Sequence, residues 1–463
     1  MMQLIGTAVC MAIIGWLFYL DRDAEEQPSA ALWIPTVWML INASRGVSSW
    51  MHRSSTVTLA QQYTDGSPVD AAVFAVLIVA GAVVLNSRSH QVRAFLRANL
   101  PLLVFFGYCA LSVLWSEQPF IAFKRWSKSV GDLIMIMVVL TDAQPLAATR
   151  RLFTRVGFVL LPLSVLFIKC YPDLGSAYSI EDERMMYFGV TTFKNLLGMI
   201  SMVFGLASLW SLLGAYDRRD LAHRTSHLIA HAVLIVTAVW LIVTADSMTS
   251  LSCFALAGAV MVLVSQSWIQ RWNKGVYIAV SGALAVPLFA LFLDTVGTLV
   301  HSLGRNATLT GRTSIWKAVL SMNTNPLIGT GFESFWLGDR LERVWNMSVH
   351  GIQEAHNGYI EIYLNLGWVG LVLLGWLIIS GFKNANTALH RNVHDGRLKF
   401  AYLTAGLIFS ITEAGFRMLG PIWLAFLLAV ACSPAPAYCS EHGRSAQMLW
   451  RRAFMPKHVR ILR

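Results

Sequence analysis

Long apolar runs alternate with short polar connections along most of this chain. A helix needs about 20 predominantly apolar residues to cross a bilayer, so the runs predict about twelve to thirteen membrane-spanning helices. The predicted spans cover residues 2–20, 29–44, 70–85, 99–115, 128–141, 156–171, 187–213, 227–244, 250–267, 275–293, 366–382, 399–415 and 417–432. The pattern therefore predicts an all-α, polytopic membrane protein.

Composition supports this fold class through its shortage of ions. Hydrophobic residues make up 56% of the chain and charged residues only 13%, whereas about a quarter of a soluble chain is charged. The six cysteines lack the spacing of a metal site, and we interpret them as small apolar residues. The first run has neither a basic segment before it nor a small-residue cleavage site, so we expect a span rather than a signal peptide.

The net charge of +11 does not indicate a nucleic-acid partner, because the basic residues gather at every second connection. The positive-inside rule assigns those connections to the cytoplasm. The connections predicted to be periplasmic are 116–127, 172–186, 245–249, 294–365 and 413–417. The amino-terminal end disagrees, since the acidic segment 21–28 would be cytoplasmic while Arg45 and Arg53 would lie outside.

One connection is far longer than the others. Loops of more than about 12–15 residues are uncommon and are usually functional. We therefore divide the chain into amino-terminal helices (1–293), a large periplasmic catalytic loop containing short helices (294–365), carboxy-terminal helices (366–432) and a basic cytoplasmic tail (433–463).

Two helix starts are predicted inside this loop. Residues 310–314 can cap a helix that runs to about Met322, with apolar residues at helical spacing. Gly329 and Gly331 predict a tight turn with free backbone amides. Arg312 lies near the first helix start and His356 near the second.

These two residues suggest transfer chemistry on a lipid-linked phosphate. Helix starts and arginine bind phosphate oxygens, and histidine accepts a proton near neutral pH. The plain alternatives are a solvated arginine and a structural histidine.

Further ions lie near the same predicted face. Lys194 would sit about 10 Å inside a helix that starts at Tyr187. It would be either a functional buried cation or a lysine whose side chain snorkels to the membrane interface. Glu413 and Arg417 are four residues apart, which favours an ion pair within a helix.

Two more cations precede the fifth span. We interpret Lys124 as an interfacial anchor, while Arg125 suits either an anchor or a phosphate contact. Asp21 and Asp23 resemble the carboxylate pair that holds a metal in soluble sugar transferases, although a solvated acidic cluster is the usual interpretation. We predict no metal site and no cofactor.

Several of these segments together resemble the O-antigen ligase and polymerase family, over roughly residues 30–432. The core motifs are residues 309–317, 325–332 and 355–360. Residues 112–116, 123–126, 189–198, 335–338 and 412–416 look most like its exopolysaccharide polymerase branch.

The resemblance implies a metal-independent glycosyltransferase whose donor is a glycan on undecaprenyl diphosphate, in the periplasmic leaflet of the bacterial inner membrane. Flippase and chain-length co-polymerase proteins would be partners. Arg312 would bind the diphosphate, and His356 would activate or orient the acceptor hydroxyl. The other predicted substrate-binding residues are Arg125, Lys194, Asn195, Glu354, Asn357, Glu413 and Arg417.

One departure concerns residues 246–250, where many ligases of this family carry an arginine and this chain has none. Either Lys194 or another cation replaces it, or the polymerase branch acts without it. Two other functions stay open: a ligase that transfers glycan to lipid A core or to protein, and a transporter of lipid-linked sugar. The missing inverted repeat weighs against a transporter.

Overall fold

The computed structural model describes residues 1–22, 28–51, 66–179, 184–218, 223–271, 275–292, 309–322, 324–347 and 352–433. The amino-terminal elements are α1 (Met2–Leu20), η1 (Ala30–Leu32), α2 (Trp33–Asn42), α3 (Val47–Trp50), α5 (Pro68–Ser87), α6 (Ser89–Ala98), α7 (Leu100–Ser112), η2 (Val113–Trp115), α8 (Pro119–Leu140), α9 (Pro145–Cys170), α10 (Pro172–Gly175), β1 (Ser176–Ser179) and β2 (Arg184–Tyr187). They are followed by α11 (Lys194–Asp217), α12 (Arg224–Thr244), α13 (Met248–Leu263), α14 (Ser267–Arg271), α15 (Gly275–Phe292), α17 (Leu309–Leu320), α18 (Asp339–Met347), α19 (Gly358–Arg391), α20 (Val393–Thr412) and α21 (Pro421–Val430).

The all-α, polytopic prediction is confirmed. Six helices of the described residues are long and apolar enough to cross a membrane, namely α1, α5, α9, α11, α12 and α19. A seventh candidate is α6 with the segment Leu100–Trp115, which is bent by 88°. Every predicted span overlaps a helix, but several of these helices are short, so the count of twelve to thirteen stays a prediction.

The predicted start of the seventh span is wrong. Tyr187 ends β2, which pairs antiparallel with β1, and α11 begins only at Lys194. Gly189 lies between them with φ of 54°, and a Cβ there would stand 2.7 Å from the Cβ of Ser164. The apolar composition of 187–193 hid this turn, because apolarity predicts burial and does not distinguish a strand from a helix.

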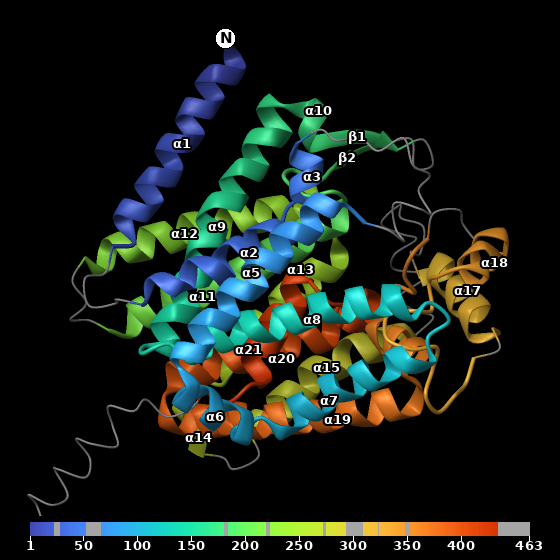
Figure 1. The fold of residues 1–463 in the computed structure, drawn as a ribbon. Helices are drawn as coiled ribbons and strands as arrows, with labels where there is room; N and C mark the ends of the chain where they lie inside the picture. Colours follow the sequence, from blue (N-terminus) through green and yellow to red (C-terminus); the bar gives the residue numbers. More distant parts are fainter. Residues whose placement is uncertain are drawn as a thin grey trace, which may run out of the picture.

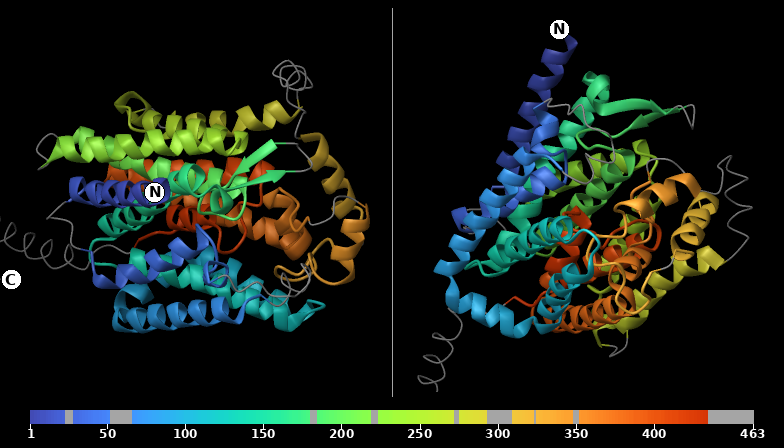
Figure 2. Two further views of the ribbon diagram at one scale, coloured as in Figure 1. Left: turned by 90° about the horizontal axis from the view of Figure 1, so that it is seen from above. Right: turned by 45° about the vertical axis from the view of Figure 1, so that its right-hand side comes forward.

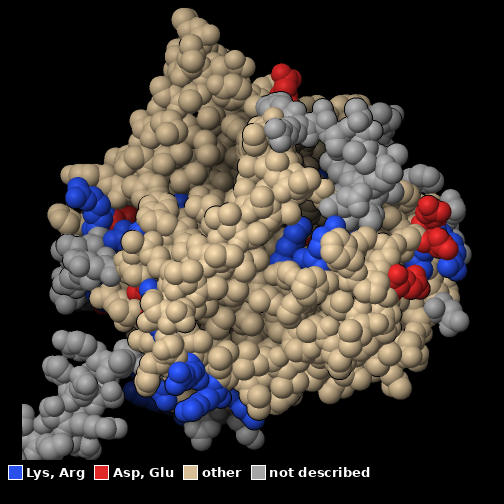
Figure 3. All heavy atoms as spheres, viewed as in Figure 1, with Lys and Arg blue, Asp and Glu red and all other residues tan. Residues whose placement is uncertain are grey.

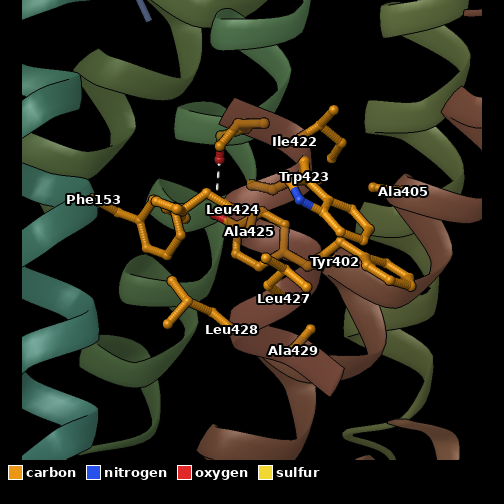
Figure 4. Close-up of a cluster of buried hydrophobic side chains, with 14 of the residues drawn as sticks. Phe153, Tyr402, Ala405, Ile422, Trp423, Leu424, Ala425, Leu427, Leu428 and Ala429 are labelled. Carbon is orange, nitrogen blue, oxygen red and sulfur yellow. Dashed lines mark hydrogen bonds between the residues drawn. The ribbon is translucent and has the colours of Figure 1, made fainter. Parts of the chain in front are cut away.

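The helices sort into a buried centre and a lipid-compatible rim. In α21 every residue is buried, and its side chains pack against Phe153 of α9 and Tyr402 of α20 (Figure 4). In contrast, α1 and α5 turn Leu4 and Val76 outward, with exposed fractions of 76% and 67%. Charge is sparse over most of the face in Figure 3, with one basic patch right of its centre and other charges near its ends. This is the surface expected of a protein dissolved in lipid.

The long loop forms one end of the bundle. Figures 1 and 2 show α17 and α18 at the end opposite to that where α1 finishes and α12 begins. The structure therefore separates the candidate site from the amino-terminal connections by the length of the bundle.

The loop is attached through a break in α19. Gly367 has φ of 64° and ψ of −163°, which interrupts the helix. The amides of Trp368 and Val369 donate instead to the carbonyls of Pro326 and Leu327. Segment 325–331 thus supplies the backbone partners that α19 loses at its break.

The glycine turn that precedes α18 is present, with φ of 68° at Gly329 and 98° at Gly331. Its amides are not free, however. Gly329 donates to the Asn325 carbonyl, Thr330 to that of Leu364 and Gly331 to that of Asn365. The tight turn is therefore present, and the prediction that its amides are free is wrong.

Candidate active site

Arg312 reaches the bundle from α17. It is the fourth residue of this helix, whose buried face includes Ile315 and Val319 and packs on the loop's own apolar cluster. Its Nη2 lies 2.6 Å from Oε1 of Glu413, and its side chain is 19% exposed. The predicted helix start is confirmed, and Arg312 ends in an ion pair rather than in solvent.

Glu413 is the centre of the site. It follows the last residue of α20 in an extended conformation, and its carboxylate is only 7% exposed. Oε1 also accepts a hydrogen bond from Asn195 Nδ2 at 3.0 Å, and Oε2 lies 3.1 Å from His356 Nδ1. The predicted intrahelical pair with Arg417 is wrong, because α20 ends at Thr412 and helical spacing no longer applies.

His356 is held between two carboxylates. Its backbone has φ of 49°, two residues before α19 begins, and its Nδ1 lies 3.0 Å from Glu354 Oε1. Burial alone would lower the pKa of His356, but hydrogen bonds and charges from Glu354 and Glu413 raise it to about 9. The imidazole is therefore protonated at neutral pH, which revises the expectation of a free proton acceptor.

Glu354 links this group to Arg417. Arg417 Nη1 lies 3.3 Å from Glu354 Oε2, and Arg417 Nε lies 3.6 Å from Glu333 Oε2. Burial raises the pKa of Glu354, but His356 and Arg417 together bring it below its usual value. Glu354 is thus an ionised partner of both cations.

Two predicted asparagines have different roles. Asn357 caps α19, since its Oδ1 accepts hydrogen bonds from the amides of Tyr359 and Ile360, and its Nδ2 donates to the Ile411 carbonyl. These contacts are structural, so they give no support to substrate binding by Asn357. Asn195 instead touches Glu413 directly and belongs to the site.

Lys194 is the first residue of α11 and is half-buried, directly before Asn195. It therefore lies at a helix start rather than deep in a span, which corrects the predicted depth. A cation at this place can approach an anion held at Arg312, and the helix start adds positive potential of its own.

Arg125 comes from α8 and is 8% exposed. Its Nη1 donates to the carbonyl of Glu333, a residue with φ of 50°. Lys124 lies over the ring of Phe120 at 5.3 Å, as suits an interfacial anchor. Arg125 therefore reaches the edge of the site through Glu333.

Sequence reasoning missed Glu333 and Glu361. Glu361 accepts hydrogen bonds from Trp336 Nε1 and from the amide of Ala355, the residue before His356. The available signal was that each of these glutamates is next to an apolar residue, Phe332 or Ile362. A carboxylate that is buried beside such a residue usually has a partner. Glu361 fixes the loop, while Glu333 holds Arg417.

The site is an arrangement of cations and carboxylates at the surface of the bundle's end. Glu354, His356 and Glu413 offer ligand atoms within 4.8 Å of one another, which could hold a metal ion. However, Arg312 already faces the carboxylate of Glu413, and Arg417 already faces that of Glu354. Arg312 and His356 are 19% and 27% exposed at their side chains, so an anionic substrate can reach them.

One small cavity adjoins the site. It has a volume of about 20 Å³ and touches Glu333 and Arg417. A cavity of about 610 Å³ lies elsewhere, at the beginnings of α9 and α20, where Arg150 and His394 line it. We assign the site by its chemistry, because a lipid-linked glycan can bind across an open surface and does not need a closed pocket.

Comparison with known proteins shows which family this chain resembles. A family model described as O-antigen ligase matches residues 232–375. The exopolysaccharide production protein ExoQ of Rhizobium meliloti (strain 1021) is 22% identical over 364 residues, which cover 75% of this chain and 79% of that protein. A protein of Rickettsia prowazekii (strain Madrid E) whose name contains polysaccharide ligase is 22% identical over 348 residues, covering 72% and 80%.

The matched residues include Arg312 and His356, on the helix and the connection that meet at Glu413. The relatives align with about three quarters of the chain, so the likeness extends well beyond the loop. With its polytopic helical fold, this chain is similar to the O-antigen ligase family over residues 232–375, and to ExoQ and a polysaccharide ligase over about three quarters of its length.

Proposed function

We propose that this protein polymerises undecaprenyl-diphosphate-linked oligosaccharide repeats into exopolysaccharide or another surface polysaccharide, at the periplasmic face of the inner membrane. The observation that carries the proposal is the convergence of Arg312 and His356 on the single carboxylate of Glu413. A flippase would deliver the donor, and a chain-length co-polymerase would be a further partner.

The donor diphosphate would compete with Glu413 for Arg312. An acceptor hydroxyl oxygen then forms a bond to the anomeric carbon, while the bond from that carbon to the diphosphate oxygen breaks. The leaving diphosphate takes the electron pair, and Arg312 stabilises its charge, with Lys194 and Arg125 as secondary contacts. Fixed cations provide this stabilisation without reorganisation at the moment of reaction.

The proton of the acceptor hydroxyl would pass to the pair formed by Glu413 and His356. Because His356 is protonated in this arrangement, its first role is to orient the hydroxyl and the carboxylate. Glu413, released from Arg312 by the donor, is then the group able to take the proton. Arginines can replace Mg²⁺ in neutralising a diphosphate, so the proposed reaction is metal-independent.

The test is a reaction of purified protein with a lipid-linked repeat, with and without EDTA, well below the unfolding temperature. We expect wild-type protein to form polymer in both. Arg312→Ala should reduce the rate by about 100- to 1,000-fold, as loss of one charge-stabilising donor does, and His356→Ala should also abolish long chains. Arg343→Ala is the matched control, because this exposed arginine of α18 bonds only its own helix among the described residues.

Full polymer length in Arg312→Ala or His356→Ala would contradict the assignment. Loss of polymer in wild-type protein with EDTA would contradict only the metal-independent chemistry.

A ligase is the second candidate, favoured by the named rickettsial relative and by the family description. It would transfer glycan to lipid A core or to protein. A strain lacking the protein distinguishes the two: single lipid-linked repeats accumulate if a polymerase is missing, and full-length lipid-linked chains if a ligase is missing. Reconstituted protein that moved lipid-linked sugar across a bilayer but joined none would favour the transporter.

A further inference from the structure

A second ionisable cluster lies at the opposite end of the bundle from the candidate active site. Asp21 follows α1, His227 and His231 come from the first turns of α12, and Arg150 comes from α9. Their exposed fractions are 1%, 2%, 1% and 5%. Figure 1 shows the carboxyl end of α1 meeting the beginning of α12 there, far from α17.

The spacing of the two histidines brings them onto one face. Residues four apart in a helix lie one above the other, so His227 and His231 both face Asp21. His227 Nδ1 lies 2.8 Å from Asp21 Oδ1, and His231 Nε2 lies 3.1 Å from the same oxygen. Arg150 Nη1 is also 2.8 Å from it.

The other carboxylate oxygen of Asp21, Oδ2, is in a different position. Asp21 Oδ2 is buried, and it has no hydrogen-bond partner among the residues that the structure describes. A buried carboxylate oxygen without a hydrogen-bond donor is costly, and it is therefore a site where a ligand is expected.

We propose that Asp21, His227 and His231 bind a divalent transition-metal ion of the zinc class. One atom from each residue lies within 4.8 Å of the others. Tetrahedral zinc with ligands at about 2.1 Å needs ligand atoms about 3.4 Å apart, so the carboxylate must turn to bring Oδ2 toward the two histidine nitrogens, which now face Oδ1. Two imidazoles and one carboxylate leave a fourth position for water.

The charges are compatible with this ion. Neutral histidines bind through the nitrogens that now face Asp21, which puts the ring protons on His227 Nε2 and His231 Nδ1, two buried atoms without a hydrogen-bond partner among the described residues. Arg150 stays on Oδ1 as an outer partner, and Oδ2 becomes the metal ligand. Outer partners of this kind orient ligands in many metal sites.

The cluster of Glu354, His356 and Glu413 is a poorer site for the same ion. Arg312 lies against one of its carboxylates and Arg417 against the other. At Asp21 a single arginine occupies a single oxygen. The two clusters therefore make different predictions for the same experiment.

The ion would join α1 to the rest of the bundle. Three α1 residues are buried, namely Cys10, Ile14 and Leu17, while most of its side chains face outward. A metal between Asp21 and α12 would hold the carboxyl end of α1 in place, so the site is structural and separate from sugar transfer.

The experiment uses the full-length protein in detergent, purified with a histidine-free tag, incubated with Zn²⁺ and desalted. Elemental analysis should find about one zinc per chain. Asp21→Asn and the double variant His227→Asn/His231→Asn should bind at least about tenfold more weakly, since loss even of an outer partner costs that much. Co²⁺ in wild-type protein should give visible ligand-field bands of a tetrahedral site.

Two matched variants separate the alternatives. His390→Ala removes an exposed histidine and His356→Ala removes the other cluster's ligand, and both should retain zinc. EDTA should lower the thermal midpoint of wild-type protein, and Zn²⁺ but not Mg²⁺ should restore it. This wild-type measurement decides the proposal even if the Asp21 variant fails to fold.

Absence of retained zinc in wild-type protein overturns the proposal, as does equal retention in the Asp21 and histidine variants. Loss of zinc in His356→Ala assigns the ion to the other cluster instead. None of these results bears on polymer formation, so failure here and failure of the proposed function are distinguishable.

Discussion

At the scale of single residues, Glu413 links groups that are far apart in the sequence. One oxygen contacts Arg312 and Asn195, and the other contacts His356. The carboxylate therefore fixes the distance between the proposed diphosphate-binding cation and the proposed acceptor-orienting imidazole. A diphosphate that takes Arg312 from Glu413 would change the charge around His356 at the same moment.

The pKa of His356 predicts a pH-dependent contribution to stability. Because its pKa rises from about 6.5 in the unfolded chain to about 9 in the fold, protonated His356 stabilises the fold fully below pH 6.5. That contribution is lost as the pH rises through 9. The difference in thermal midpoint between wild-type protein and His356→Gln should therefore shrink as pH rises over this range.

Glu413→Gln provides the check on the cause. It removes one of the two carboxylates that raise the pKa of His356. The stabilising contribution of protonated His356 should therefore be lost at a lower pH than in wild-type protein. A midpoint difference that is constant with pH, or a transition unchanged in Glu413→Gln, would show that His356 is not charged by these partners.

At the scale of elements, the break in α19 determines how the loop is attached. A Cβ at Gly367 would stand 2.3 Å from the carbonyl carbon of Leu327, and one at Gly329 would stand 2.4 Å from that of Asn365. Both glycines also have positive φ. The two backbones therefore approach each other only because neither residue has a side chain.

Gly367→Ala should consequently lower stability by at least about 1–3 kcal/mol, the usual cost of strained backbone, and should reduce polymer formation. Thermal unfolding in detergent measures the first effect and polymer length in cells the second. Gly375→Ala on the same helix is the control, because a Cβ there meets nothing within 4 Å. Equal midpoints for the two variants would mean that the loop does not depend on the break.

At the scale of the whole molecule, the structure accounts for part of the disagreement at the amino-terminal end, since Arg53 lies outside the described residues. Asp21 lies with Arg150 and His227, beside connections predicted to be cytoplasmic. Arg45 points to the other end, where it donates to the carbonyls of Leu174, Gly189 and Thr191. Its charge is bound within the fold, so Arg45 is a poor guide to sidedness.

Cysteine labelling tests this sidedness. In a background whose six native cysteines are replaced by alanine, Glu342→Cys on α18 should react with a membrane-impermeant maleimide in spheroplasts. Arg391→Cys at the end of α19 should react only after permeabilisation. Both positions are exposed, so accessibility depends on the side of the membrane. The reverse pattern would place the candidate site in the cytoplasm.

The sequence alone determined that lipid surrounds the fold, and it predicted where the site lies. Apolar runs and scarce ions required a helical membrane protein, because lipid leaves backbone groups no other partners. Arg312, His356 and their motifs predicted a site in the loop through the family resemblance, while the residues alone left a solvated arginine and a structural histidine open.

Tertiary structure decided which of these groups meet. Glu413 and Arg417 are four residues apart yet have separate principal partners, because the helix ends before Glu413. Glu413 at His356, Leu364 at the amide of Thr330 and His227 at Asp21 are each more than twenty positions from the residue they contact. Periodicity describes one element at a time, whereas charge state and strain depend on the contacts between elements.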